Sequence, residues 1–180
     1  MKPSRLQPAL YLIAGLTIAG CVSSPAKQAD VPAALRAAPD QSMFLEALAS
    51  GVQIYECSAK PDMPAAYAWK FKGPEATLLD RAGQPLGKHF GGPTWESIDG
   101  SRVVGAVVGS DPGPDAAAIP WLLLSARSTS GSGVLGKTTS IQRLFTSAGL
   151  APSTPCTAAI AQQVARVPYT ATYRFYRQAN

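Results

Sequence analysis

The sequence is poor in charged residues and in histidine. Charged residues make up 15% of its 180 positions, and His89 is the only histidine. A standard zinc site needs more ligands than one histidine can supply. Any Ser-His-Asp arrangement would have to use His89, and no G-x-S-x-G segment is present. We therefore expect no metal, no cofactor and no catalytic residues.

Long apolar runs and basic clusters are also lacking. The longest apolar stretch covers roughly 11 residues, 9–19, whereas a membrane-spanning helix needs about 18 or more. The 16 basic and 11 acidic residues are scattered, and two of the basic ones, Lys2 and Arg5, lie ahead of that stretch. No basic run alternates with aromatic residues, so nucleic-acid binding is not expected.

The first 20 residues have the parts of a secretory signal: a basic start, a short apolar run and small residues before a break. Ile18, Ala19, Gly20 and Cys21 resemble the bacterial lipobox, whose cysteine is acylated and becomes the new N-terminus. By the same resemblance, Val22 favours the outer membrane, with the protein facing the periplasm. The alternative is plain signal cleavage, which would leave Cys21 unmodified.

This interpretation divides the chain into three parts. Residues 1–20 are expected to form the signal peptide, and residues 21–39, rich in Ala, Pro and Ser, a flexible tether. Residues 40–180 would be a single domain. Anchoring through several acyl chains is stable, because each buried methylene contributes about 0.8 kcal/mol.

Two cysteines remain if Cys21 carries lipid. Export brings Cys57 and Cys156 into an oxidising compartment, where a disulfide between them is the expected state. The alternative, a catalytic cysteine, needs a positioned base, and His89 has no sequence relation to either cysteine.

Short segments with β character recur through the domain, separated by turns drawn from 16 Gly and 16 Pro. Residues 44–49 and 52–57 flank Ser50 and Gly51, which predict a hairpin break. Residues 169–177 alternate with a period of two. The pattern predicts an all-β domain, mainly an antiparallel sandwich or barrel of about nine to ten short strands with little helix.

Residues 131–138, from Gly131 to Thr138, match the P-loop pattern letter by letter. A P-loop holds phosphates with backbone amides at the start of a helix. Here residues 139–146 are rich in β-branched side chains and alternate like a strand. No apolar strand ending in aspartate follows to hold a magnesium ion. We therefore expect no nucleotide.

The densest group of unusual residues lies between 87 and 101, and it suggests a ligand site formed by His89, Thr94, Trp95 and Asp99. Trp95 could offer a stacking surface, with His89 and Asp99 as hydrogen-bonding neighbours. The alternative, which isolated strand aromatics favour, is that Trp95 packs in the core and Asp99 makes a turn. Arg143 is a fifth candidate, either inward-facing or, as its charge favours, on the solvent face.

Several motifs, taken in order, resemble the domain-of-unknown-function family 3455, a family of small exported proteins. They are residues 51–57, 69–76, 92–95 with 99–101, 119–124, 141–143 with Thr146, Cys156, and 167–171 with 173–176. The resemblance covers residues 30 to 177 and implies that Cys57 and Cys156 occur together, consistent with pairing. It implies no activity. Residues 135–139 depart from the expected apolar strand start.

These observations predict a lipid-anchored envelope protein that is a non-catalytic binding or structural module, with an envelope protein or a glycan as partner. The alternatives are a ligand-binding module for a glycan, or a hydrolase, centred on residues 89–101. A rigid β scaffold without a recognised catalytic set favours binding over catalysis.

Overall fold

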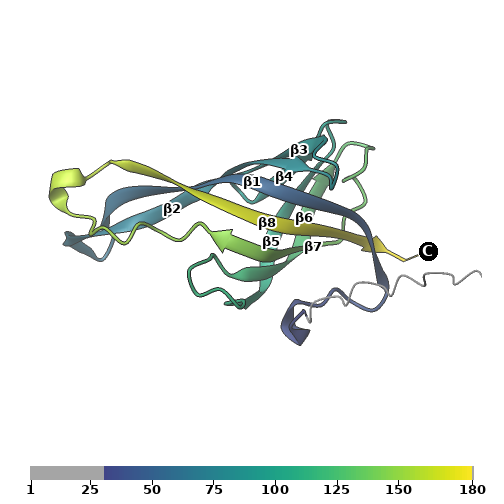
Figure 1. Ribbon diagram of the computed structural model, residues 1–180, viewed down its shortest axis with the longest axis horizontal. Coiled ribbons are helices and arrows are strands. Elements are labelled where there is room, and N and C mark those ends of the chain that lie inside the picture. Colours follow the sequence, from purple (N-terminus) through teal and green to yellow (C-terminus); the bar gives the residue numbers. More distant parts are fainter. Residues whose placement is uncertain (1–30, 180) are drawn as a thin grey trace, which may run out of the picture. The chain divides into compact units, whose positions relative to one another are not determined.

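The computed structural model describes residues 31–179, whose regular structure is almost entirely strand (Figure 1). The elements are η1 (Ala33–Leu35), β1 (Gln41–Lys60), β2 (Met63–Leu79), β3 (Pro85–Phe90), β4 (Thr94–Ser97), β5 (Arg102–Asp111), β6 (Trp121–Ser130), β7 (Ser140–Ala148), η2 (Ala158–Ile160) and β8 (Val164–Gln178). The all-β prediction is confirmed. Instead of nine or ten short strands there are eight, three of them long. No helix in this part of the chain is long and apolar enough to cross a membrane.

Each strand pairs antiparallel with the next, and β8 returns to pair with β1, so the sheet closes into a barrel. The fold is therefore the barrel of the two predicted architectures. Because neighbouring strands run in opposite directions, successive loops lie at alternate ends. We call one end the closed end, with loops 80–84, 98–101 and 131–139. The other is the arm end, with loops 61–62, 91–93, 112–120 and 149–163.

The hairpin break expected at Ser50 and Gly51 is wrong, because β1 runs straight through both residues. Gly51 is needed there for a different reason. A Cβ atom on Gly51 would lie 2.1 Å from the Glu75 carbonyl oxygen and 2.6 Å from the Ala76 Cβ. Glycine thus permits a close approach of β1 and β2 within the curved sheet.

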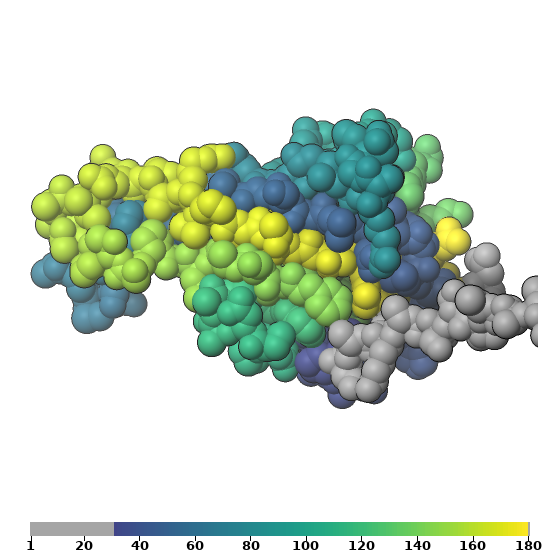
Figure 2. All heavy atoms as spheres, in the orientation of Figure 1, coloured from purple at the N-terminus to yellow at the C-terminus, as the bar shows by residue number. Residues whose placement is uncertain are grey.

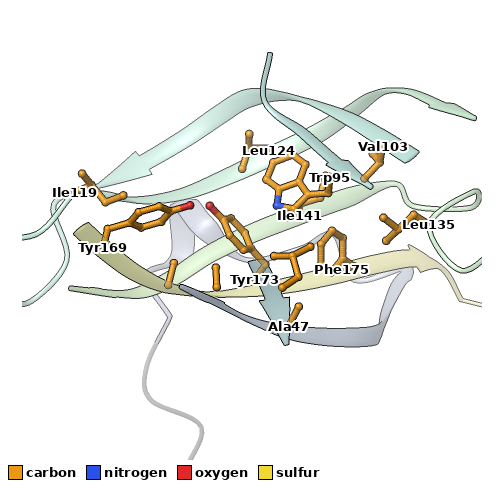
Figure 3. Close-up of a cluster of buried hydrophobic side chains, with 13 residues drawn as sticks. Ala47, Trp95, Val103, Ile119, Leu124, Leu135, Ile141, Tyr169, Tyr173 and Phe175 are labelled. Atoms are coloured by element: carbon orange, nitrogen blue, oxygen red, sulfur yellow. The ribbon is translucent and has the colours of Figure 1, made fainter. Parts of the chain in front are cut away.

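Alternate side chains of each strand fill the barrel, as the period of two in β8 predicts. The buried core cluster is drawn in Figure 3; it consists of Ala47, Ala49, Leu78, Trp95, Val103, Ile119, Leu124, Leu135, Ile141, Tyr169, Ala171, Tyr173 and Phe175. Four of these come from β8 at every second position. Three of these core residues, Trp95, Tyr169 and Tyr173, are aromatic and carry a polar atom into the barrel interior.

A second, smaller cluster lies on the outside of β6 and β7. Leu35 of η1 is fully buried against Trp121 and Leu144, and the Gln142 side-chain amide donates a 2.6 Å hydrogen bond to the Leu35 carbonyl. Residues 31–35, which fall in the expected tether, are therefore packed on the barrel. The compact unit begins at Val31 rather than at residue 40. Cys21 and the expected signal peptide lie outside the described residues.

The outer parts of β1, β2 and β8 extend beyond the other strands at the arm end, and we call this extension the arm (Figure 1). Loop 149–163 lies over the arm, and the hairpin tip at residues 61–62 stays exposed beside it (Figure 2). A disulfide between Cys57 and Cys156, with 5.5 Å between the Cα atoms, joins that loop to β1. The Trp69 indole adds a 2.9 Å hydrogen bond to the Thr154 carbonyl. The expected pairing of the two cysteines is thus present.

Candidate functional site

The barrel wall is incomplete beside the β3–β4 hairpin. β3 has 6 residues and β4 has 4, whereas their outer neighbours β2 and β5 have 17 and 10. Pairing of β2 with β3 stops at Glu75, and pairing of β4 with β5 stops at Val104. Beyond these points β2 pairs only with β1, and β5 only with β6. The short hairpin therefore leaves a side opening toward the arm end.

A cavity of about 230 Å³ lies behind this opening. Its lining comes from all eight strands and the β3–β4 turn, and consists of Gln53, Phe71, Lys72, Gly73, Pro74, His89, Gly92, Pro93, Trp95, Val107, Leu122, Leu124, Arg143 and Tyr173. Phe71 and Val107, on either side of the opening, are half exposed. Eight strands make a barrel just wide enough to be filled by side chains or to hold one small ligand.

Three polar side chains in this lining are buried without a hydrogen-bond partner among residues 31–179. They are the amide nitrogen of Gln53, the indole nitrogen of Trp95 and the hydroxyl of Tyr173, from residues that are 2%, 1% and 1% exposed. About nine in ten buried polar groups in proteins have a partner. Three exceptions around one cavity mark a place where another molecule can supply the missing partner.

Tyr169 adds a second hydroxyl to the interior. Figure 3 shows the hydroxyls of Tyr169 and Tyr173 turned toward one another, and neither makes a hydrogen bond of normal geometry with a described residue. Burial raises the pKa of Tyr169 and raises that of Tyr173 well above its usual value. Both phenols are therefore protonated at neutral pH and keep a proton to donate.

His89 is held as a neutral ring. It stacks on Trp95 with ring centres 4.3 Å apart and planes 9° apart, and Tyr173 meets it edge-on. The Nδ1 atom lies 2.9 Å from the Thr94 carbonyl oxygen, which can only accept, so Nδ1 carries the proton and Nε2 is a free acceptor. Burial lowers the pKa of His89 to about 3, and the charge of Arg143 acts in the same direction.

Arg143 points into the barrel, so the expectation that it faces solvent is wrong. Its Nε and Nη2 atoms donate hydrogen bonds of 3.0 and 2.8 Å to the Pro120 carbonyl, which fixes the guanidinium at the cavity wall. None of the ion pairs found among residues 31–179 includes Arg143. A cation without a carboxylate partner is thus built into the lining.

The structure brings His89, Trp95 and Arg143 together in the cavity lining, with Thr94 next to it and Asp99 elsewhere. Thr94 is buried beside them, where its carbonyl binds His89 and its hydroxyl donates to the Gly91 carbonyl at 3.3 Å. Asp99 lies in loop 98–101 at the closed end, away from the cavity. The set expected at residues 87–101 is therefore divided between two ends of the barrel.

Asp99 and the P-loop-like segment form one structural unit. One Asp99 carboxylate oxygen accepts hydrogen bonds from the Ser101 hydroxyl at 2.5 Å and the Ser101 amide at 2.9 Å, and the other accepts from the Val134 amide at 2.7 Å. These bonds, the Ser101 hydroxyl first, lower the pKa of Asp99 to about 2.

The conformation of residues 131–138 is not that of a P-loop. The Val134 amide is bound to Asp99, the Leu135 amide donates to the Ser101 hydroxyl, and the Leu135 side chain is buried in the barrel core. Strand β7 follows instead of a helix. The first six residues also spell the G-x-G-x-x-G pattern of dinucleotide-binding folds, which requires the same missing helix. The absence of a nucleotide partner stays a prediction.

Sequence reasoning did not single out Gln53 or Tyr173 as site residues. One signal was available for each. Gln53 occupies the same alternating face as Tyr55 and Cys57, so it is a polar residue in an inward position. Tyr173 follows Tyr169 and Ala171 on the inward face of β8. What the sequence lacks is any indication that these hydroxyl and amide groups would be left without partners.

Fold and cavity together define a closed antiparallel barrel with an internal site that combines an apolar wall with a few polar groups and opens through the side of the barrel. The family model described as "Protein of unknown function (DUF3455)" matches residues 38–177, and the chain belongs to this family. No curated protein matches the chain, and neither does any solved structure.

Proposed function

We propose that this protein is a binding module that holds one small ligand inside the barrel. The observation that carries the proposal is the convergence of three buried, unpartnered polar groups, those of Gln53, Trp95 and Tyr173, on one cavity. Leaving such a group without a partner costs about 1–3 kcal/mol. A ligand that accepts hydrogen bonds from them would recover much of that cost.

The chemistry of the lining supports binding rather than catalysis. Among the described residues that line the cavity there is no carboxylate, serine, threonine or cysteine that could act as a nucleophile. His89, the residue type most often used for acid–base catalysis, has a pKa of about 3, far from the range that suits a general base at neutral pH. Of the other titratable side chains in the lining, Lys72 is paired with Glu56 at 3.3 Å, and burial raises the pKa of Tyr173 well above its usual value. The mechanism of the site is therefore recognition: a preformed pocket, fixed donors and an apolar wall.

A stacked sugar ring is less well supported as the ligand than a smaller amphipathic molecule. One face of Trp95 is covered by His89, and Tyr173 and Phe175 meet the indole in T-shaped contacts. Trp95 is 1% exposed, so it offers no open face as a stacking platform. Its remaining contribution is the indole N–H.

We also propose that the barrel is exported and tethered by lipid on Cys21, at the outer membrane and facing the periplasm. The lipobox resemblance carries this proposal, and the disulfide between Cys57 and Cys156 supports it, because such bonds persist in oxidising compartments. Labelled palmitate should be incorporated into the wild type and not into Cys21→Ser. Label that persists in the variant would reject the anchor.

The binding proposal is tested by blocking the opening. N-phenyl-1-naphthylamine is a neutral dye whose fluorescence rises in apolar surroundings, and we expect saturable binding of one dye per barrel. Val107→Trp places a large ring at the side opening and should weaken dye binding by about tenfold or more, which corresponds to ~1.4 kcal/mol.

Val108→Trp is the matched control. Val108 is the next residue of β5, is as exposed as Val107, and does not line the cavity. Its variant should bind the dye like the wild type. The proposal is contradicted if the wild type shows no saturable binding, or if both tryptophan variants bind equally.

A further inference from the structure

The charged groups that line the cavity are all cationic. Two cations, Lys72 and Arg143, lie in the lining, together with donors on Gln53, Trp95 and Tyr173, and no described lining residue is acidic. Lys72 is near the surface and pairs with Glu56 at 3.3 Å. Arg143 is the inner cation, and it has no carboxylate partner among residues 31–179. Such a set favours a ligand that brings negative charge and accepts hydrogen bonds.

The rest of the lining is hydrocarbon. Apolar side chains from β2, the β3–β4 turn, β5 and β6 make up the wall: Phe71, Pro74, Pro93, Val107, Leu122 and Leu124. Burial of apolar ligand surface against such a wall contributes about 25 cal/mol per Å². Arg143 on β7 and Tyr173 on β8 lie across the barrel from the opening between β2 and β5, whereas Gln53 and Trp95 are on β1 and β4, the strands that pair with β2 and β5. A ligand entering through the opening would meet the cation with its leading end and leave its body at the wall.

Resting on the proposed binding function, we infer that the ligand is a small carboxylate with an apolar body, and that Arg143 is the residue that selects its charge. The guanidinium is already oriented by its two hydrogen bonds to the Pro120 carbonyl, so little side-chain freedom is lost on binding. The indole N–H of Trp95, the amide of Gln53 and the hydroxyl of Tyr173 supply neutral donors within the same cavity. The Nε2 of His89 is an acceptor at the same site.

The test compares two probes of nearly the same shape, 2-naphthoate and its neutral counterpart 2-naphthamide, by isothermal titration calorimetry. The wild type should bind the carboxylate at least about tenfold more tightly than the amide. Arg143→Met keeps the length of the side chain and removes its charge, so it should bring the ratio of the two affinities close to one. Arg127→Met, at an exposed position of β6 outside the cavity, removes the same charge and should leave the ratio unchanged.

The possible outcomes distinguish a failure of the proposed binding function from a failure of charge selection by Arg143. If neither probe binds the wild type, the proposed function fails and this inference fails with it. If both bind the wild type equally, or Arg143→Met keeps the preference for naphthoate, the charge selection is overturned while the binding function stands. The wild-type ratio is decisive even if Arg143→Met does not fold. In that case Arg143→Lys, which keeps the positive charge, should still prefer the carboxylate. If Arg143→Lys lost that preference, selection of the ligand by the charge at position 143 would be contradicted.

Discussion

Single buried polar residues determine the character of the barrel interior. The side chains of His89, Gln53 and Tyr173 are surrounded by apolar and aromatic side chains, and each makes at most one hydrogen bond to residues 31–179. Burying a polar side chain lowers the stability of the folded protein unless the group forms a hydrogen bond. For His89 the free-energy cost of burial can be measured, because the protonation of its ring differs between the folded and the unfolded chain.

The pKa of His89 is about 3 in the folded protein, against 6.5 for an ordinary histidine. Between these values the unfolded chain binds a proton that the folded chain does not, so stability falls as the pH falls below 6.5. We expect the wild type to lose roughly 2 kcal/mol of unfolding free energy between pH 7 and pH 5 through this group. Urea denaturation at several pH values measures the loss.

His89→Gln is the comparison variant, since an amide can still donate to the Thr94 carbonyl but does not titrate in this range. Its stability should change much less between pH 7 and pH 5. The carboxylates of Glu46, Glu96 and Asp99 have lowered pKa values, so the stability they contribute is lost only at lower pH. An equal loss in the wild type and His89→Gln would show that His89 is not the titrating group.

At the scale of the elements, the lengths of the strands, more than their number, determine where the arm and the side opening form. β1, β2 and β8 are long and build the arm, whereas β3 and β4 are short and leave the side opening. The alternation in β8 predicted its inward face from sequence. The lengths of β1 and β2 were not predictable in the same way, because glycines inside them resemble turns when only neighbouring residues are considered.

Gly51 is the clearest case. The pair Ser50 and Gly51 is typical of a turn, yet the need for glycine comes from Glu75 and Ala76 on the neighbouring strand, about 25 residues away. Local sequence carries no information about that contact. The same holds for Asp99, whose turn was expected but whose bond to Val134 depends on the loop between β6 and β7.

Gly51→Val should be strongly destabilising, by about 3 kcal/mol or more, because the new Cβ would overlap the backbone of β2. Ser50→Val is the control in the same strand: Ser50 is exposed, and valine suits a strand. Its unfolding midpoint in urea should stay near that of the wild type. If Gly51→Val matched Ser50→Val, the close approach of β1 and β2 would be wrong.

At the scale of the whole molecule, closure of the sheet creates the site. The lining residues come from β1 to β8 and are distant in sequence, and the return of β8 to β1 closes the barrel so that Gln53, Trp95 and Tyr173 line one cavity. Sequence patterns predicted an all-β domain and named His89, Trp95 and Arg143. They could not show that these three meet at one cavity, or that Asp99 does not, because that depends on which loops share an end of the barrel.

The central claim is that the barrel interior receives a ligand, and the unpartnered N–H groups report on this directly. In a two-dimensional ¹H–¹⁵N spectrum the Trp95 indole and the Gln53 side-chain amide give resolvable signals that can be followed during a titration with 2-naphthoate. The account predicts that both signals shift and saturate together at one ligand per protein in the wild type and in Val108→Trp, but not in Val107→Trp. Indole and amide signals that stay fixed while resonances on the outer surface shift would contradict it.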